Sequence, residues 1–126
     1  MSAYVGSKLI VDTPYVLLEH LEKKKLARLC WKKNPSSLEY RVAIMAFLNL
    51  LTKQHIELML FNNTFAGLIS EEDQEWSRFY IKTLLPKTQL QKLACVVAGN
   101  LFQKMIIEEM HISAKYDTYA LALFSE

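Results

Sequence analysis

Two short apolar runs constrain the fold of this chain more than any other feature. Residues 56–61 read Ile-Glu-Leu-Met-Leu-Phe, and residues 93–98 read Leu-Ala-Cys-Val-Val-Ala. A strand with one face in water alternates apolar and polar residues, whereas a run that is apolar on both faces is typical of an interior strand covered on both sides. The runs therefore predict two neighbouring strands in the middle of one sheet, with helices above or below.

A helix is predicted after the first run. Asn62 and Asn63 suit the end of a strand, because their side chains bond nearby backbone groups. Ser70 is the predicted N-cap, and Asp73 is expected to reach back to it as an imperfect capping box. Pro86 ends this helix. Its inner face is predicted to hold residues at helical spacing, namely Trp76, Phe79, Tyr80, Thr83 and Leu84.

A longer helix is predicted over residues 36–53. Ser36 and Glu39 have the spacing of a capping box. Its inner face is predicted to consist of Tyr40, Ala43, Phe47, Leu50 and Leu51, widened by Ile44, Met45 and Leu48.

The remaining elements complete an α/β order. We expect an edge strand at 8–12, a hairpin of strands 15–22 and 26–32, a helix at 100–110, a strand at 112–116 and a final helical segment at 119–124, with residues 1–7 loose. The fold class is therefore a single-domain α/β sandwich with a mixed sheet, in which an antiparallel hairpin leads into right-handed β-α-β crossovers.

The composition of the chain limits the kinds of partner that we expect it to bind. The chain has 126 residues and a net charge of +2, which is too balanced to argue for nucleic acid or an anionic membrane as a partner, so we expect neither. Its 52% hydrophobic content means that the sheet is well covered or that some apolar surface binds a partner.

Cys30 and Cys95 are interpreted as buried reduced thiols, with a disulfide or a metal site as the alternatives. The N-terminus resembles no signal peptide, and the longest helical apolar run, 42–51, is shorter than the ~20 residues of a membrane span. We expect a cytoplasmic protein without membrane insertion.

No catalytic constellation is present in the sequence. His20, His55 and His111 are far apart and lack the spacing of metal ligands. There is no glycine-rich phosphate loop and no G-x-S-x-G motif. The carboxylates at 71–75 are interpreted as a solvated cluster at a helix start. We therefore expect no catalytic, metal or cofactor-binding residues and no enzyme activity.

Residues 69–76 resemble a known family. The segment Ser70-Glu-Glu-Asp-Gln-Glu-Trp76 is similar to a signature of small uncharacterised bacterial proteins, mainly from Bacteroidetes, that look like STAS (SpoIIAA-like) domains. The resemblance to this family extends from about residue 8 to the end of the chain. It includes the helix start Ser37-Leu-Glu-Tyr-Arg41, an early Tyr-Val hairpin and a late Val-Val strand. The resemblance implies a STAS-like fold and a regulatory module, with signal transduction as its setting.

The best-known STAS relatives are anti-anti-sigma factors, which resemble this chain except at one turn. They carry an Asp-Ser-x-Gly turn whose serine is phosphorylated, whereas this chain has Asn62-Asn63-Thr64-Phe65-Ala66-Gly67. Thr64 and Ser70 are only positional candidates for a phosphate. The resemblance places an interaction loop for a protein partner at Asn62, Asn63, Thr64, Phe65, Ser70, Asp73, Gln74 and Trp76.

Two other expectations stay open. STAS-like sheets also resemble lipid-transfer domains of the SEC14 type, so the alternative function is a small-molecule or lipid-binding domain. Its pocket would be lined by methionines and by Phe61, Phe65, Trp76, Phe79 and Tyr80, for which a filled core is the competing interpretation. A homodimer is compatible with either function, through the open face of the first hairpin or the apolar segment 119–124.

Overall fold

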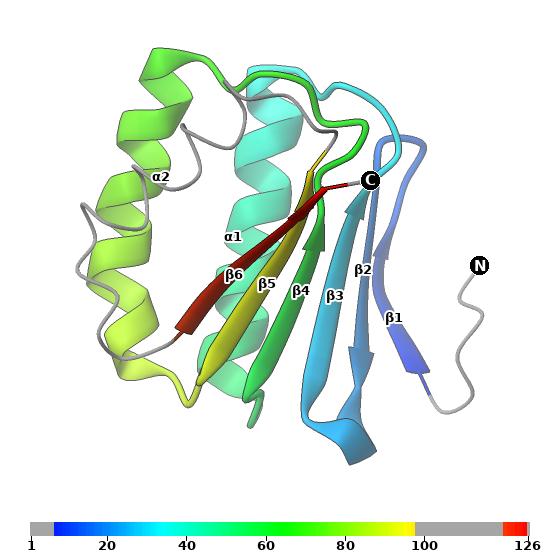
Figure 1. Cartoon of the computed structure of the whole chain (residues 1–126), viewed down its shortest axis with the longest axis vertical. Coiled ribbons are helices and arrows are strands. Elements are labelled where there is room, and N and C mark those ends of the chain that lie inside the picture. Colours follow the sequence, from blue (N-terminus) through cyan, green and yellow to red (C-terminus); the bar gives the residue numbers. More distant parts are fainter. Residues whose placement is uncertain (1–6, 98–119, 126) are drawn as a thin grey trace.

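The two apolar runs form neighbouring interior strands of one mixed sheet. The computed structural model describes residues 7–97 and 120–125 (Figure 1). Its strands are β1 (Ser7–Asp12), β2 (Val16–Leu21), β3 (Leu26–Trp31), β4 (Leu58–Asn62), β5 (Lys92–Val97) and β6 (Ala120–Ser125), and its helices are α1 (Ser37–Lys53) and α2 (Glu71–Leu84). The strands pair in chain order: β1, β2 and β3 are antiparallel, and β4, β5 and β6 continue parallel to β3. The predicted hairpin, edge strand and parallel strands at 56–61 and 93–98 are confirmed.

Short 3₁₀ turns connect some of these elements. The hairpin between β2 and β3 turns through η1 (Glu22–Lys24) and Lys25, whose φ of 52° lies in the left-handed region. A second 3₁₀ turn, η2 (Leu85–Lys87), follows α2 and contains Pro86, which has no N–H to continue the helix. α2 therefore ends where the proline predicted it.

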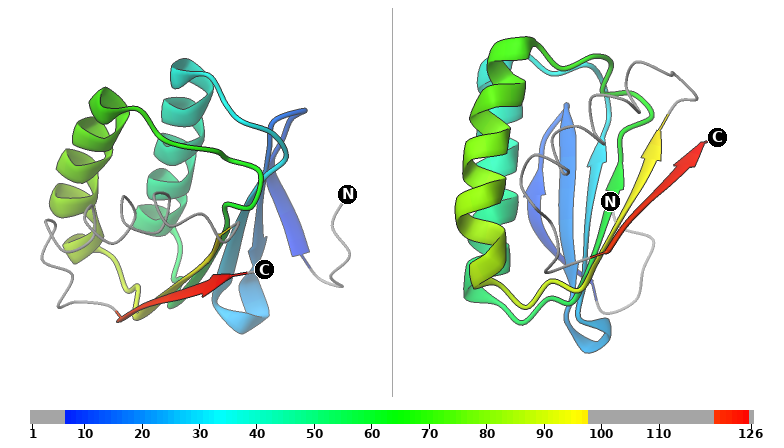
Figure 2. Two further views of the ribbon diagram at one scale, coloured as in Figure 1. Left: turned by 45° about the horizontal axis from the view of Figure 1, so that its top comes forward. Right: turned by 60° about the vertical axis from the view of Figure 1, so that its left-hand side comes forward.

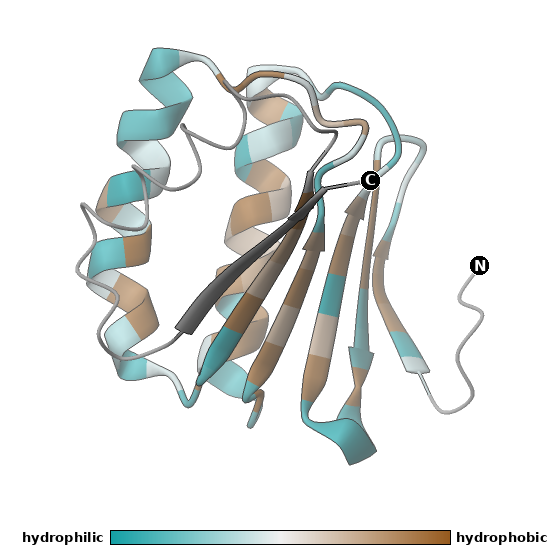
Figure 3. Cartoon of the chain, in the orientation of Figure 1, coloured by the Kyte–Doolittle hydropathy of each residue, from teal (hydrophilic) through white to brown (hydrophobic). Residues whose placement is uncertain are grey.

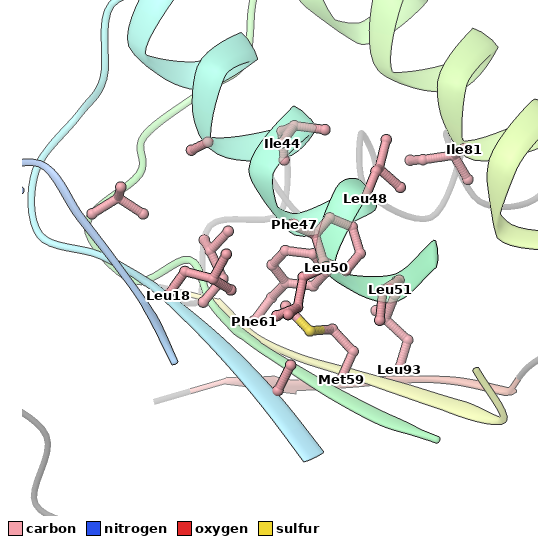
Figure 4. Close-up of a cluster of buried hydrophobic side chains, with 14 of the residues drawn as sticks. Leu18, Ile44, Phe47, Leu48, Leu50, Leu51, Met59, Phe61, Ile81 and Leu93 are labelled. Atoms are coloured by element: carbon pink, nitrogen blue, oxygen red, sulfur yellow. The ribbon is translucent and has the colours of Figure 1, made fainter. Parts of the chain in front are cut away.

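The pairing register of the strands places a row of apolar side chains, one from each strand, under the helices. Leu29 of β3 pairs with Phe61 of β4, which pairs with Cys95 of β5. Paired residues point to the same face of a sheet, so this row meets α1. Phe61 contacts Phe47 of α1 edge to face, with ring centroids 4.8 Å apart. Figure 4 shows the resulting core, in which α1 lies directly over β3 and β4.

The prediction for the face of α1 is confirmed with one exception. Tyr40, Ala43 and the other predicted inner residues are buried, and the capping box of Ser36 and Glu39 is present. Met45 was expected to widen this face, but it is exposed. Met45 and Val42 lie on the side of the helix that faces away from the sheet. Figure 3 shows that apolar residues predominate along β4 and β5.

The two helices cover the same face of the sheet. Figure 2 shows α1 and α2 side by side in one layer. The predicted helix at 100–110 falls outside the described residues, so a cover on the other face of 56–61 stays a prediction. β4 alternates between buried and more accessible residues, and Leu58 is 37% exposed. Its apolar composition is thus not explained by a second layer among the described helices.

The C-terminal segment differs in type from its prediction. Residues 119–124 were expected to be helical, but β6 occupies Ala120–Ser125 and pairs with all six residues of β5. Alanine and leucine favour helices locally, and pairing with β5 overrides that weak preference. The predicted helix at 100–110, the strand at 112–116 and most of the loose N-terminus lie outside the described residues.

The cysteines lie on opposite faces of the sheet. Cys95 pairs with Phe61 on the helix-covered face, whereas Cys30 pairs with Asn62, the next residue of β4, on the other face. Both thiols are free, and burial raises the pKa of Cys95 to about 12. This placement rules out a disulfide between them and agrees with buried thiols, although Cys30 is only half-buried.

Across residues 7–97 and 120–125, no helix has the length and apolar character needed to cross a membrane.

Candidate functional site

A small pocket lies where the chain enters the two helices. β3 and β4 both end at this edge of the sheet, and the loops that leave them lead into α1 and α2 (Figure 1). The pocket has a volume of about 160 Å³. It is lined by Asn34, Pro35, Ser37, Tyr40, Ala66, Leu68, Ile69, Ser70 and Asp73. In open α/β sheets, ligands bind beyond the carboxyl ends of the strands, which is where this pocket lies.

The β4–α2 loop, residues 63–70, is held against the β3–α1 connection at one close contact. The Asn34 side-chain amide donates a hydrogen bond to the Ala66 carbonyl oxygen. Gly67 follows with a φ of +75°, and a Cβ there would come within 2.5 Å of Asn34 Nδ2. A glycine is therefore required both by the backbone conformation and by the closeness of Asn34. This contact forms one wall of the pocket.

Two helix N-termini meet at the pocket. The Ser36 hydroxyl accepts from the Glu39 N–H at the start of α1, and the Ser70 hydroxyl accepts from the Asp73 N–H at the start of α2. The Ser70 cap is confirmed. The Asp73 carboxyl interacts with the Ser70 side chain and also crosses to α1, where Ser37 and Arg41 donate to it.

Asp73 joins the two helices. Its Oδ1 accepts hydrogen bonds from Ser37 Oγ at 2.8 Å and from Arg41 Nε at 2.8 Å. Burial raises the pKa of the Asp73 carboxyl, but the hydrogen bonds from Arg41, Ser37 and Ser70 and the charge of Arg41 outweigh it, so the net pKa is lowered. Asp73 is therefore an ionised carboxylate in a position that is only 5% exposed.

The interpretation of residues 71–75 as one solvated cluster is wrong for Asp73. Glu71, Glu72 and Glu75 are exposed as expected. Asp73 instead shares its helical face with Ser77 and Ile81, and these three are the buried residues of α2. The predicted inner face of α2 is displaced accordingly. Trp76, Tyr80 and Leu84 lie at its margin, partly buried against the core, whereas Phe79 and Thr83 are exposed.

Arg41 was missed as a site residue. Ser37 and Arg41 are four residues apart, so they lie on the same side of α1 and reach the same carboxylate. Arg41 Nη2 also lies 3.5 Å from Glu72 Oε1, and its guanidinium carbon is 5.2 Å from the Trp76 ring centroid. The i, i+4 spacing in the Ser-Leu-Glu-Tyr-Arg run was the available signal, but nothing local identified the partner on α2.

Aromatic rings continue from the pocket into the space between the helices. Trp31 stacks on Tyr40 at 5.8 Å, Tyr40 meets Trp76 at 6.4 Å, and Trp76 contacts Tyr80 at 5.0 Å. The Tyr40 hydroxyl and Ser77 Oγ are 2.6 Å apart in a buried hydrogen bond. Burial and, less strongly, the nearby Asp73 charge raise the pKa of Tyr40 to about 12, against the lowering effect of the Ser77 hydrogen bond. Tyr40 thus acts as a neutral packing residue.

The eight residues of the predicted interaction loop divide into three groups. Ser70 and Asp73 line the pocket. Gln74 Nε2 donates to the Ile69 carbonyl, and Trp76 lies under Arg41. The other four precede the pocket wall in sequence, and these are Asn62, Asn63, Thr64 and Phe65.

The turn that starts this loop is well supported. Asn62 Oδ1 accepts from the Thr64 N–H at 3.1 Å, as an asparagine at a strand end was expected to do. The Asn63 N–H donates to the Val96 carbonyl oxygen at 2.7 Å. Phe65 is exposed at the turn, while Thr64 Oγ1 is buried. Of the two positional candidates for a phosphate, one hydroxyl is therefore buried and the other, on Ser70, caps a helix.

The aromatic residues proposed for a lipid pocket do not line the pocket described here. Phe61 packs into the core against Phe47, and Phe65 and Phe79 are exposed. The volume of about 160 Å³ is also below the ~300 Å³ at which small-molecule sites begin. This pocket therefore suits a small group, such as one side chain or a small ion, and does not suit a lipid tail.

The described residues contain no group of three His, Cys, Asp or Glu side chains that could hold a metal ion. His20 lies within a strand of the sheet, and His55 pairs with Glu57 at 2.7 Å. Comparisons of this sequence with protein-family models, of the chain with curated proteins and of the fold with solved structures found no match.

Proposed function

We propose that this protein is a non-catalytic regulatory module of the STAS-like type that binds another protein at the pocket. The observation that carries the proposal is a set of three exposed apolar side chains that line the pocket or adjoin its lining residues in sequence, here called the rim. It consists of Leu38, Phe65 and Leu68, which are 74%, 63% and 54% exposed. Leu68 lines the pocket, and Leu38 and Phe65 are chain neighbours of the lining residues Ser37 and Ala66.

The composition of this surface favours a protein partner. Large apolar side chains that are exposed together favour burial in an interface, and aromatic anchors contribute much of the energy of such interfaces. The rim adjoins a pocket that is lined by a carboxylate and two serines. Exposed apolar side chains next to a small polar pocket suit the anchoring of one side chain of a partner. The STAS-like resemblance supports a regulatory role and a place in signal transduction.

The loop that carries Phe65 and Leu68 is held by a side-chain hydrogen bond from each of two neighbouring segments. Asn34 holds Ala66, and Gln74 holds Ile69 at 3.0 Å. A preorganised loop loses less conformational entropy when a partner binds, so it supports higher affinity. Phe65 and Leu68 are therefore presented on backbone that is already in place.

The test is capture of partners from the source cells with a rim variant. Phe65→Ser together with Leu68→Ser is expected to remove the partner that wild type retains. Val42→Ser together with Met45→Ser is the matched control, because these apolar residues are also exposed but lie on the outer side of α1. Circular dichroism and thermal melting verify that both variants fold. A partner kept by the rim variant and lost from the control would reject the rim as the interface.

A homodimer remains a compatible prediction. Within the described residues, β1 and β6 are the outer strands of the sheet, and each has one side without a neighbouring strand. Unpaired strand edges can join two copies. Sedimentation equilibrium at high protein concentration measures this directly, and a monomer would contradict it.

A further inference from the structure

We propose that the outer face of the helix layer binds a second copy of this chain, with α1 of one protomer lying antiparallel over α2 of the other. The helix layer is the pair α1 and α2, and its outer face is the one turned away from the sheet (Figure 2). This surface is distinct from the rim and from the strand edges. The inference therefore does not rest on the proposed partner, and it gives the homodimer a defined interface.

Exposed apolar side chains lie on the outer face of both helices. Val42 and Met45 of α1 are 51% and 38% exposed, and Phe79 of α2 is 61% exposed. The Phe79 ring packs edge to face on Tyr80, with centroids 5.0 Å apart, so it is held in place before any partner binds. Large apolar side chains that gather on one surface favour burial in an interface.

The apolar side chains of the two helices lie at the same height along the layer. α1 begins at Ser37 and α2 at Glu71, so Met45 and Phe79 are each the ninth residue of their helix. The two helices run in the same direction, because each leads from the end of one parallel strand to the start of the next. An ion pair also joins their N-terminal ends. Met45 and Phe79 therefore form one apolar centre across the layer.

The two ends of this face carry opposite charge. Glu71 and Glu75 are exposed near the start of α2, whereas Lys53 and Lys82 are exposed near the ends of α1 and α2. Arg41, which lies at the acidic end, is already paired with carboxylates of α2. A two-fold axis perpendicular to the layer turns the second copy end for end, so the acidic end of each copy meets the basic end of the other. The face is complementary to itself, which favours a second copy as its partner.

The symmetry specifies which residues meet. An axis that passes between Met45 and Phe79 places Met45 of each copy over Phe79 of the other. Glu71 is eight positions before Phe79, and Lys53 is eight positions after Met45. Each of these charged residues therefore lies about 12 Å from the axis along the layer. Lys53 of one copy faces Glu71 of the other, and the two-fold axis repeats this ion pair.

The size of the face indicates a weak dimer. Helix α1 has 17 residues, so it is about 25 Å long, and two adjacent helices are about 20 Å wide. Each copy thus offers on the order of 500 Å², and the total of about 1,000 Å² is at the low end of specific interfaces. We expect a dimer Kd on the order of 100 μM, which corresponds to monomers in dilute solution and dimers near 1 mM.

The first experiment is sedimentation equilibrium from about 10 μM to about 1 mM, a range that brackets this Kd. The average mass of wild type is expected to rise from 14.6 kDa toward twice that value. Phe79→Ser is expected to raise the Kd about tenfold, because a central aromatic anchor is lost. Leu9→Ser removes an exposed apolar side chain from β1, outside this face, and should leave the Kd unchanged. A wild type that stays monomeric, or equal Kd values for Phe79→Ser and wild type, would overturn the proposal.

A charge exchange tests the antiparallel arrangement. Lys53→Glu and Glu71→Lys should each raise the Kd about three- to tenfold, because like charges then meet twice in the dimer. The double variant Lys53→Glu with Glu71→Lys should return close to the wild-type Kd, since the opposite charges face each other again. Circular dichroism verifies that each variant folds. A double variant at least as weak as the single variants would reject this pairing of the helices.

The rim and the helix layer can be separated with variants already introduced. Val42→Ser together with Met45→Ser is expected to weaken the dimer and to keep the partner that binds at the rim. Phe65→Ser together with Leu68→Ser is expected to do the reverse. A chain that remains monomeric at about 1 mM but still captures its partner through the rim would reject this inference and leave the proposed function standing.

Discussion

Arg41 Nε lies 2.8 Å from Asp73 Oδ1 and so connects the first turns of α1 and α2 through a half-buried ion pair. Arg41 lies in the run 37–41 and Asp73 in the run 70–76, so the two residues are 32 positions apart. The contact aligns two helix N-termini beside one pocket. It also explains why an aspartate in an acidic helix start is buried.

Asp73→Asn is expected to lower the free energy of unfolding by about 1–3 kcal/mol at pH 7, because the charged acceptor of two hydrogen bonds is lost. The folded pKa of Asp73 lies below the ordinary 3.8. The stabilisation is therefore present above pH 3.8 and is lost as the pH falls through the folded pKa. Urea unfolding at neutral and acidic pH measures this. Glu72→Gln, at an exposed position, is the control and should change stability by less than about 0.5 kcal/mol.

Tyr40→Phe is expected to lower the free energy of unfolding by about 1–3 kcal/mol, because Ser77 Oγ would be left buried without its hydrogen-bond partner. Adding Ser77→Ala should recover part of the loss, since the unsatisfied group is then removed. Additive losses in the double variant would contradict a direct Tyr40–Ser77 bond. In ultraviolet titration of wild type, one tyrosine should ionise only near pH 12, and that phase should be absent from Tyr40→Phe.

Glu19 and Arg28 form an ion pair across β2 and β3 on the face opposite the helices. Glu19 Oε1 is 2.9 Å from Arg28 Nε, and Glu19 is 0% exposed. Arg28→Met alone is expected to destabilise by about 2–4 kcal/mol, because it leaves a buried carboxylate without its partner charge. Glu19→Leu with Arg28→Met should be closer to wild type, as apolar replacements of buried pairs often are. Thermal melts of wild type, the two single variants and the double variant form a double-mutant cycle. Equal losses of stability in the single and the double variants would contradict the expected recovery.

His20 gives the fold a pH dependence near neutrality. Burial lowers its pKa below 6.5, with Glu22 acting in the opposite direction and Lys8 in the same direction. The unfolded chain then binds a proton that the folded chain does not, so stability falls as the pH drops below 6.5. His20→Gln should flatten this part of the profile in urea unfolding, whereas His55→Gln, at an exposed histidine, should keep the decline. A steep profile in His20→Gln would show that other groups cause it.

Gly67→Ala is expected to destabilise by about 1–2 kcal/mol, because alanine disfavours a φ of +75° and its Cβ would approach Asn34. Asn34→Ala removes the closest atom and also the hydrogen bond to Ala66. If crowding between the new Cβ and Asn34 contributes, the double variant Gly67→Ala with Asn34→Ala should lose less stability than the sum of the two single variants. A fully additive result would assign the cost to the backbone conformation alone.

Local patterns predicted most of the first 97 residues. The capping serines, Ser36 and Ser70, mark both helix starts because a cap involves only groups within one turn. In β3 the buried residues Ala27, Leu29 and Trp31 alternate with more accessible ones, since side chains on a strand alternate between its two faces. The expectations that failed were those in which one element meets another. They include the helical segment 119–124, which is a strand, and the inner face of α2.

The sequence alone determined where α1 and α2 begin and where α2 ends, because capping and turn chemistry depend on residues close along the chain. The tertiary structure alone decided that Asp73 is buried, that Arg41 and Ser37 reach it, and that the loop after β4 closes a pocket against Asn34. Each of these is a contact between segments about 30 positions apart. A long-range contact depends on how the sheet sets one helix beside the other, and no local pattern carries that information.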